Sequence, residues 1–227
     1  MPHFLNVNTI AFELLGYPMS YVELVGTILY LWSVWLISKR WVLTWPVGII
    51  SVLLYMVLFY QIRLYSDAIE QVYYLGASVY GWIVWNRSAQ NEGQVQDVGY
   101  GSLRSVLMWI ILTVIFSFLV GIFMSRVHVL LPLFFPEAAS YPLLDALTTV
   151  MSFTAMWLMA RKRVESWAYW IIVDVIGIWL YFVKDVKFIS LLYIVLLVMA
   201  INGLRSWHRA SKQAVFTQPL MPAGKMN

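Results

Sequence analysis

Two tryptophans and an aspartate follow one another at helical spacing in the otherwise apolar stretch SWAYWIIVD. At about 100° per residue, Trp167, Trp170 and Asp174 fall on one face of a helix, in a stripe roughly 80° wide that also holds Gly177 and Tyr181. A carboxylate inside an apolar span costs about 2.5 to 3.5 kcal/mol, so such residues usually face a bundle interior and a partner or pathway. The alternatives are a carboxylate bonded to a neighbouring helix and tryptophans that anchor the span at the membrane surface.

A second stripe of the same width is also polar and aromatic. In the stretch 68–86 it consists of Gln71, Tyr74, Ser78, Trp82 and Trp85. Two faces that carry rings and hydrogen-bonding groups, on helices far apart in the sequence, could line a single cavity. If both faces turned toward lipid, a structural or adaptor membrane protein would be the better interpretation.

Three further polar residues lie within apolar stretches. Asn202, in AINGLRSW, can hold an amide-bearing ligand because its side chain both donates and accepts hydrogen bonds. The alternative is a contact between helices, which asparagine often makes in membranes. Glu23 and Asp145 lie near the ends of their stretches, so we expect them to face water or to pair locally and assign them no role.

The composition is that of an integral membrane protein. Of the 227 residues, 62% are hydrophobic and only 11% are charged, far from the values of a soluble domain. The absence of cysteine excludes disulfides, thiolate metal sites and cysteine nucleophiles. The net charge of +4 does not indicate nucleic-acid binding, because the basic residues flank apolar stretches.

Signals for catalysis are missing from the sequence. It contains no GxxxxGK[ST] nucleotide loop, no HExxH and no GxSxG, and the three histidines lie outside the apolar stretches. We therefore predict no catalytic residue, no metal and no cofactor. A membrane enzyme is the alternative from a different class, but it would need a titrating pair or a metal cluster in the bundle, and Asp174 is the one deep carboxylate.

Seven stretches are long and apolar enough to cross a bilayer as helices, which takes about 20 residues each. Eleven of the 15 Lys and Arg residues then lie on the side that holds the C-terminus, so we expect this side to be cytoplasmic and the N-terminus outside. Residues 1–20 are expected to form an amphipathic segment at the membrane interface, and residues 208–227 a cytoplasmic tail. The predicted spans are 21–38, 43–61, 68–86, 103–125, 143–160, 167–183 and 188–207.

The sequence also indicates a duplication. A shift of 122 residues places Trp35 on Trp157 and aligns a first three-helix repeat, 21–86, with a second, 143–207, on either side of a linker, 87–142, that contains the fourth span. In the middle of each repeat a shift of 126 pairs Gly48 with Asp174, which implies a loop four residues longer before the middle helix of the second repeat. Because the fourth span restores the orientation, the all-α fold has parallel repeats in a 3+1+3 arrangement, like the full-length duplication of SWEET transporters. In that architecture the substrate site is expected between the repeats.

The chain resembles the PnuC family of bacterial vitamin transporters, whose best-known members carry nicotinamide riboside. The resemblance is carried by WPVGIISVLLYMVLFYQIRLYSDAIEQVYYLGASVYGWIVW, LMARKRVESWAYWIIVD and YIVLLVMAINGLRSW, and it covers almost all of 21–207. It implies a homotrimer in the bacterial cytoplasmic (inner) membrane, with one translocation path per subunit. It further implies facilitated diffusion, with the substrate trapped inside by a separate kinase that phosphorylates it.

The resemblance also suggests roles for single residues. Trp167 and Trp170 match the family's WxxW element, which is linked to substrate binding, and Gln71, Asp174 and Asn202 fall where we expect contact with the ligand. Together with the neighbouring residues of the two stripes, the candidate substrate-binding set is Trp170, Asp174, Asn202, Gln71, Trp167, Tyr74, Ser78 and Tyr181.

The chemistry of nicotinamide riboside suits these residue types. Its pyridinium cation would be attracted to indole and phenol faces by about 2 kcal/mol when desolvated, and Asp174 would add charge complementarity. Asn202 and Gln71 could bond its carboxamide or ribose. A nucleotide phosphate would instead need Arg or Lys in the path. Thiamine, another flat cation, is the second candidate, and riboflavin, which is larger and neutral, would make less use of Asp174.

Overall fold

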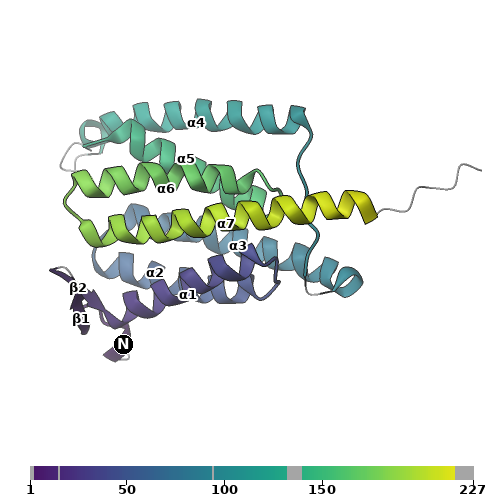
Figure 1. The fold of residues 1–227 in the computed structure, drawn as a ribbon. Helices are drawn as coiled ribbons and strands as arrows, with labels where there is room; N and C mark the ends of the chain where they lie inside the picture. The colour runs from purple at the N-terminus through teal and green to yellow at the C-terminus, as the bar shows by residue number, and fades with distance from the viewer. Residues whose placement is uncertain (1–2, 15, 94, 132–139, 218–227) are drawn as a thin grey trace, which may run out of the picture.

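The computed structural model describes residues 3–14, 16–93, 95–131 and 140–217, which form seven long helices and one small hairpin (Figure 1). A 3-10 turn, η1 (His3–Leu5), and the antiparallel strands β1 (Ile10–Leu14) and β2 (Tyr17–Ser20) come first. The helices are α1 (Tyr21–Ser38), α2 (Thr44–Gln61), α3 (Tyr65–Glu92), α4 (Leu103–Leu130), α5 (Pro142–Ala160), α6 (Ser166–Val183) and α7 (Lys187–Thr217).

Six of these helices are long and apolar enough to cross a membrane, so the chain is a multi-pass membrane protein. The exception is α3, which has 28 residues but contains Glu70, Gln71 and several tyrosines that lower its apolar character. The predicted number of helices is therefore confirmed, and six of the seven predicted spans have the composition of a span.

Six helices form a closed ring. In order around it, α1 packs on α2, α2 on α3, α3 on α5, α5 on α6, α6 on α7, and α7 again on α1. Helix α4 lies outside this ring along the edge made by α5 (Figure 1). Thr113 of α4 and Thr154 of α5 share a hydrogen bond of 3.0 Å, and Gly121 lets α4 approach Leu143 closely.

Both ends of the chain differ from the expected picture. Within residues 1–20, expected as an amphipathic interfacial segment, 10–14 and 17–20 pair as the β1–β2 hairpin, which lies at one end of the bundle (Figure 1). We call this the hairpin end. At the other end α7 continues through residues 208–217, which we had assigned to a tail, and residues 218–227 lie outside the described part. His128 lies within α4, which is longer than the predicted fourth span.

The spacing between matching elements is constant at 122 residues. Helix α2 covers 44–61 and α6 covers 166–183, and the helices that follow begin at 65 and 187. The loops match too: Arg40 and Lys162 both have positive φ, 64° and 60°, and so do Arg63 and Asp185, 63° and 59°. Left-handed backbone is uncommon outside glycine, so its recurrence at positions 122 residues apart supports this spacing between the two groups of helices. The predicted shift of 126, with its longer loop before the middle helix, is wrong.

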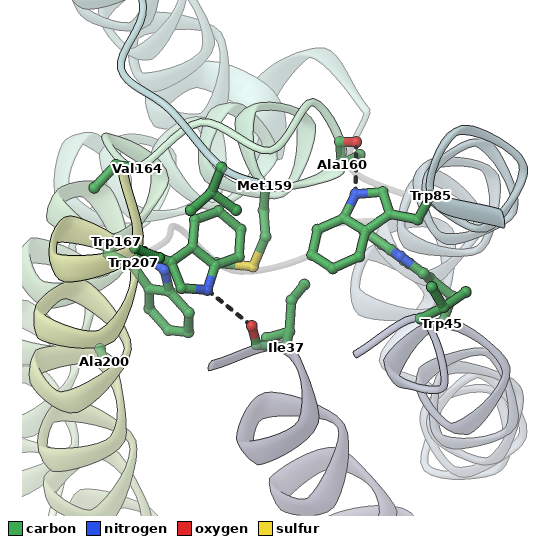
Figure 2. Close-up of a cluster of buried hydrophobic side chains, with 12 residues drawn as sticks. Ile37, Trp45, Trp85, Met159, Ala160, Val164, Trp167, Ala200 and Trp207 are labelled. Atoms are coloured by element: carbon green, nitrogen blue, oxygen red, sulfur yellow. Dashed lines mark hydrogen bonds between the residues drawn. The ribbon is translucent and has the colours of Figure 1, made fainter. Parts of the chain in front are cut away.

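Four tryptophans meet at the end opposite the hairpin, and we call them the tryptophan cluster: Trp45, Trp85, Trp167 and Trp207 (Figure 2). Trp45 and Trp85 meet edge to face at 5.4 Å, as do Trp167 and Trp207 at 5.6 Å, while Trp85 and Trp207 lie 5.9 Å apart. Edge-to-face pairs each add about 0.5 to 1.5 kcal/mol to the effect of burial alone.

Two hydrogen bonds from this cluster cross between helix groups far apart in sequence. Trp85 Nε1 of α3 donates to Ala160 O at the end of α5 (3.0 Å), and Trp207 Nε1 of α7 donates to Ile37 O near the end of α1 (2.9 Å) (Figure 2). The last carbonyls of a helix have no partner within the helix, and Trp85 supplies one to Ala160 O. Ile37 O accepts from Arg40 N at 2.9 Å as well as from Trp207, so this indole adds a second bond to a carbonyl that already has one.

The cluster depends on two glycines without side chains. A methyl group on Gly81 would overlap the Trp45 ring, and one on Gly203 would overlap the Trp167 ring. Glycine therefore allows α3 and α7 to approach the two indoles closely.

We expect Gly81→Ala to lower the free energy of unfolding by about 1 to 3 kcal/mol, the usual cost of overpacking. Gly76, on the same helix, has open space around its Cα, so Gly76→Ala should be neutral or slightly stabilising. Thermal unfolding of both variants in detergent would check this, and equal midpoints would contradict the close approach at Gly81.

We expect Trp85→Phe to lower the free energy of unfolding by about 1 to 3 kcal/mol, because it leaves a buried carbonyl without its donor. Trp207→Phe should cost less, because Ile37 O keeps the hydrogen bond that it accepts from Arg40 N at 2.9 Å. The control is Trp82→Phe on the same helix, where the ring is 42% exposed. Unfolding midpoints that do not separate Trp85→Phe from Trp82→Phe would show that the cross-helix hydrogen bond contributes nothing measurable.

Candidate functional site

A cavity of about 350 Å³ lies inside the ring. All six ring helices contribute to its wall, and among the described lining residues none belongs to α4. Its volume is within the range of about 300 to 1,000 Å³ that is typical of small-molecule sites. The ring thus encloses one space that runs along the bundle, from Phe59 and Phe188 at the hairpin end to Trp45 and Trp167 at the other end.

Seven of the eight candidate residues line this cavity. The stripe on α3 contributes Gln71, Tyr74 and Ser78, and the stripe on α6 contributes Trp167, Trp170, Asp174 and Tyr181. The last two residues of the α3 stripe do not line the cavity, since Trp82 is exposed and Trp85 belongs to the tryptophan cluster. Both polar faces therefore point into one space rather than toward lipid, and a role in binding stays a prediction.

Asp174 lies halfway along α6 and is only 4% exposed. No hydrogen bond or ion pair joins its side chain to another of the described residues, so a neighbouring helix does not account for it. A buried carboxylate without a partner is costly, and the cost falls when a cation or a hydrogen-bond donor enters the same space.

Asn202 is the candidate that the structure does not bring to the cavity. Its side chain is exposed on α7, whereas Ala200, two residues earlier, lines the cavity. Two residues correspond to about 200° of rotation on a helix, so the two side chains face opposite sides.

Among the described residues, no group of three His, Asp or Glu side chains could hold a metal ion.

Sequence reasoning missed several lining residues. Trp45 occupies the position of Trp167 when the constant spacing of 122 is used, and the incorrect shift of 126 hid this match. The rings of Tyr30, Tyr55 and Tyr193 also line the cavity. They lie in apolar stretches that show no obvious polar stripe. Their position in the ring, which is known only from the structure, brings them to the cavity.

Glu23 is a further lining residue that the sequence analysis did not include in the candidate site. It was expected to face water or to pair locally; it does pair locally, with the Tyr17 hydroxyl donating to its Oε1 at 2.7 Å, but it is buried and lines the cavity. Asp145, its counterpart, does as expected and forms an ion pair with Lys184 at 3.7 Å. The charged lining residues among those described are Glu23 and Asp174, and none is Lys, Arg or His.

The tryptophan cluster forms the floor of the cavity. Trp45 and Trp167 belong to both, and each has a buried Nε1–H without a hydrogen-bond partner among the described residues. A buried donor without a partner costs about 1 to 3 kcal/mol. Both N–H groups are thus unsatisfied donors buried at this end of the cavity.

The linker between α3 and α4 crosses beneath this floor, and we call residues 95–101 the strap. Gln96 N donates to Arg40 O (3.0 Å) in the α1–α2 loop. On the other side, Gly99 N donates to Lys162 O and Gly99 O accepts from Val164 N, both at 3.1 Å, in the α5–α6 loop. Val98 packs into the same buried cluster as the tryptophans. The strap thus ties two matching loops together and closes this end.

Comparison with known proteins agrees with the geometry. The family model described as nicotinamide mononucleotide transporter matches residues 20–209. The nicotinamide riboside transporter PnuC of Escherichia coli (strain K12) is 32% identical over 216 residues, which are 87% of this chain and 89% of that protein. The riboflavin/roseoflavin transporter RibM of Streptomyces davaonensis is 29% identical over 91% of this chain and 93% of its own length.

A solved structure shares the fold. The crystal structure of the vitamin B3 transporter PnuC matches with a TM-score of 0.67 and 22% identity, over 85% of this chain and 83% of that chain. With the family model spanning most of the sequence, and with a relative above 30% identity along nearly its whole length, the chain belongs to the PnuC family of nicotinamide riboside and related vitamin transporters.

Proposed function

We propose that the protein takes up nicotinamide riboside by facilitated diffusion through the cavity of the six-helix ring. The observation that carries this proposal is the charge of the wall, which offers two carboxylates and no basic side chain among the described lining residues. Such a wall favours a cation and disfavours a phosphate. Nicotinamide riboside has a pyridinium cation and no phosphate, whereas the mononucleotide in the family description carries one.

The remaining groups of the cavity suit the rest of this molecule. Trp170 and the tyrosines offer aromatic faces to a flat cation, an attraction of about 2 kcal/mol when water is excluded. Gln71 can bond the carboxamide or the ribose hydroxyls. Asp174, at half depth and without a partner among the described residues, is the proposed counter-charge of the substrate's pyridinium group.

Two related substrates are kept as alternatives. Thiamine is also a flat aromatic cation, so the cavity wall does not separate it from nicotinamide riboside. Riboflavin is supported by the similarity to RibM, but a neutral ring system gains little from Asp174 or Glu23. The family and the cavity support a transporter over a membrane enzyme.

We further propose how the protein lies in the membrane. The constant spacing of 122 residues supports two parallel three-helix repeats around α4, with α3 as the seventh span. The excess of Lys and Arg supports a cytoplasmic strap end and an external hairpin end in a bacterial inner membrane. A homotrimer, and trapping of the substrate by a cytoplasmic kinase, follow from the family resemblance.

The experiment that tests the substrate is isothermal titration of the purified protein with nicotinamide riboside, thiamine, riboflavin and nicotinamide mononucleotide, followed by uptake of the tightest ligand into proteoliposomes without an ion gradient. We expect nicotinamide riboside to bind most tightly and to equilibrate across the bilayer. Preference for the mononucleotide would overturn the charge argument, and preference for thiamine or riboflavin would change the substrate but keep the site.

We expect Asp174→Asn to weaken nicotinamide riboside binding by about 2 kcal/mol, roughly 30-fold, because the pyridinium loses its buried counter-charge. Asn202→Ala changes a side chain outside the cavity and should leave the affinity unchanged. Titration of both variants gives the measurement. Unchanged affinity in Asp174→Asn would remove this residue from the site, and a loss in Asn202→Ala would restore the role expected from the sequence.

A further inference from the structure

Glu23 is a buried carboxylate at the hairpin end of the cavity. It is the third residue of α1, its side chain lines the cavity, and the residue as a whole is 8% exposed. Its backbone N–H is fixed by Ser20 Oγ, which caps the helix at 3.3 Å. The carboxylate is thus held in a defined position at the start of α1, far along the helix from Ile37 at the opposite end of the path.

The carboxylate has a neutral partner and no cationic one. Tyr17 OH donates to Glu23 Oε1, and none of the ion pairs found between described residues includes Glu23. Burial, together with the hydrogen bond to Glu23, raises the pKa of Tyr17 far above its usual range, so the phenol stays a donor. A negative group in this setting keeps most of its attraction for a positive charge, because the low-dielectric surroundings screen it weakly.

The matching residue of the other three-helix group is neutralised instead. Asp145 pairs with Lys184, its side chain is 42% exposed, and it does not line the cavity. The two acidic residues therefore share a sequence position, 122 residues apart, but have different environments. Of these two matched acids, only Glu23 lies on the wall of the path without a cationic partner among the described residues.

Aromatic rings surround this place. Tyr17 stacks on Phe188 of α7 at 5.2 Å between ring centroids, and Tyr55 stacks on Phe59 of α2 at 5.7 Å. Phe188, Tyr55 and Phe59 all line the cavity together with Glu23. A carboxylate beside ring faces suits a flat organic cation, which can lie against a ring while its charge meets the acid.

We propose that Glu23 is a specificity-determining residue of this transporter, a second carboxylate that selects cationic over neutral substrates at the hairpin end of the path. This inference rests on the proposed function. It differs from the role of Asp174, because Glu23 stands at the mouth of the path and Asp174 at its midpoint. The selected class is a flat aromatic cation without a phosphate.

The test compares two probes that differ in charge but hardly in shape, nicotinamide riboside and its reduced, uncharged dihydro form. Each is titrated into the full-length wild type, Glu23→Gln and Asp145→Asn. Glutamine keeps the size and the oxygen that accepts from Tyr17, so only the charge is lost. We expect Glu23→Gln to weaken binding of the cation by about tenfold and to leave the dihydro form unchanged. Asp145→Asn should change neither.

The outcomes separate this inference from the proposed function. If the wild type binds nicotinamide riboside and Glu23→Gln binds it with the same affinity, the inference is overturned and the proposed function stands. Equal losses of affinity for both probes would also overturn it, since they would indicate a structural role for Glu23. Two controls identify that case: the thermal unfolding midpoints of the variants, and the affinities of Glu23→Asp, which restores the charge. A wild type that binds riboflavin and neither nicotinamide riboside nor thiamine would overturn both.

Discussion

The structure depends on the closure of a ring of helices from two groups that are distant in sequence. The closing contacts are two indole hydrogen bonds that run in opposite directions, from Trp85 to the end of α5 and from Trp207 to the end of α1. Each uses a donor from the last helix of one group and an acceptor from the first helix of the other. Within a membrane the hydrophobic effect does not hold helices together, so packing and satisfied polar groups must do so. The cavity lies inside this ring, and the tryptophans that make the closing contacts stand at one end of it.

The cavity also illustrates how a nearly symmetric frame supports an asymmetric site. Matching positions carry Trp45 and Trp167, which both reach the floor. The acids do not match in this way, because Asp174 lies opposite Val52 at the spacing of 122, and Glu23 is matched by the neutralised Asp145. The element bounds recur at a spacing of 122 residues, but the charges on the wall do not. A substrate with one positive centre and two chemically different ends suits such a wall better than a symmetric molecule would.

Much of the fold could be predicted because its signals are local. Apolar stretches of span length and the stripe on α6 follow from composition and from helical geometry, and seven of the eight candidate residues line one cavity. The remainder depends on tertiary contacts. Asn202 looked suitable by residue type, but the side of α7 that faces the ring is set by its packing on α1 and α6. The hairpin of residues 10–20 was missed because its pairing partner is itself, in a segment with weak alternation.

The strap has a mechanical consequence. Its backbone hydrogen bonds reach Arg40 on one side and Lys162 and Val164 on the other, so the two loops that carry the ends of α1 and α5 share one tether. Those two loops cannot move apart unless the main-chain bonds on at least one side of the strap break. The strap therefore opposes any widening of this end of the bundle, and Val98, packed with the tryptophans, anchors it there. None of the described strap residues, 95–101, lines the cavity, so a substitution there would alter this tether without changing the cavity wall.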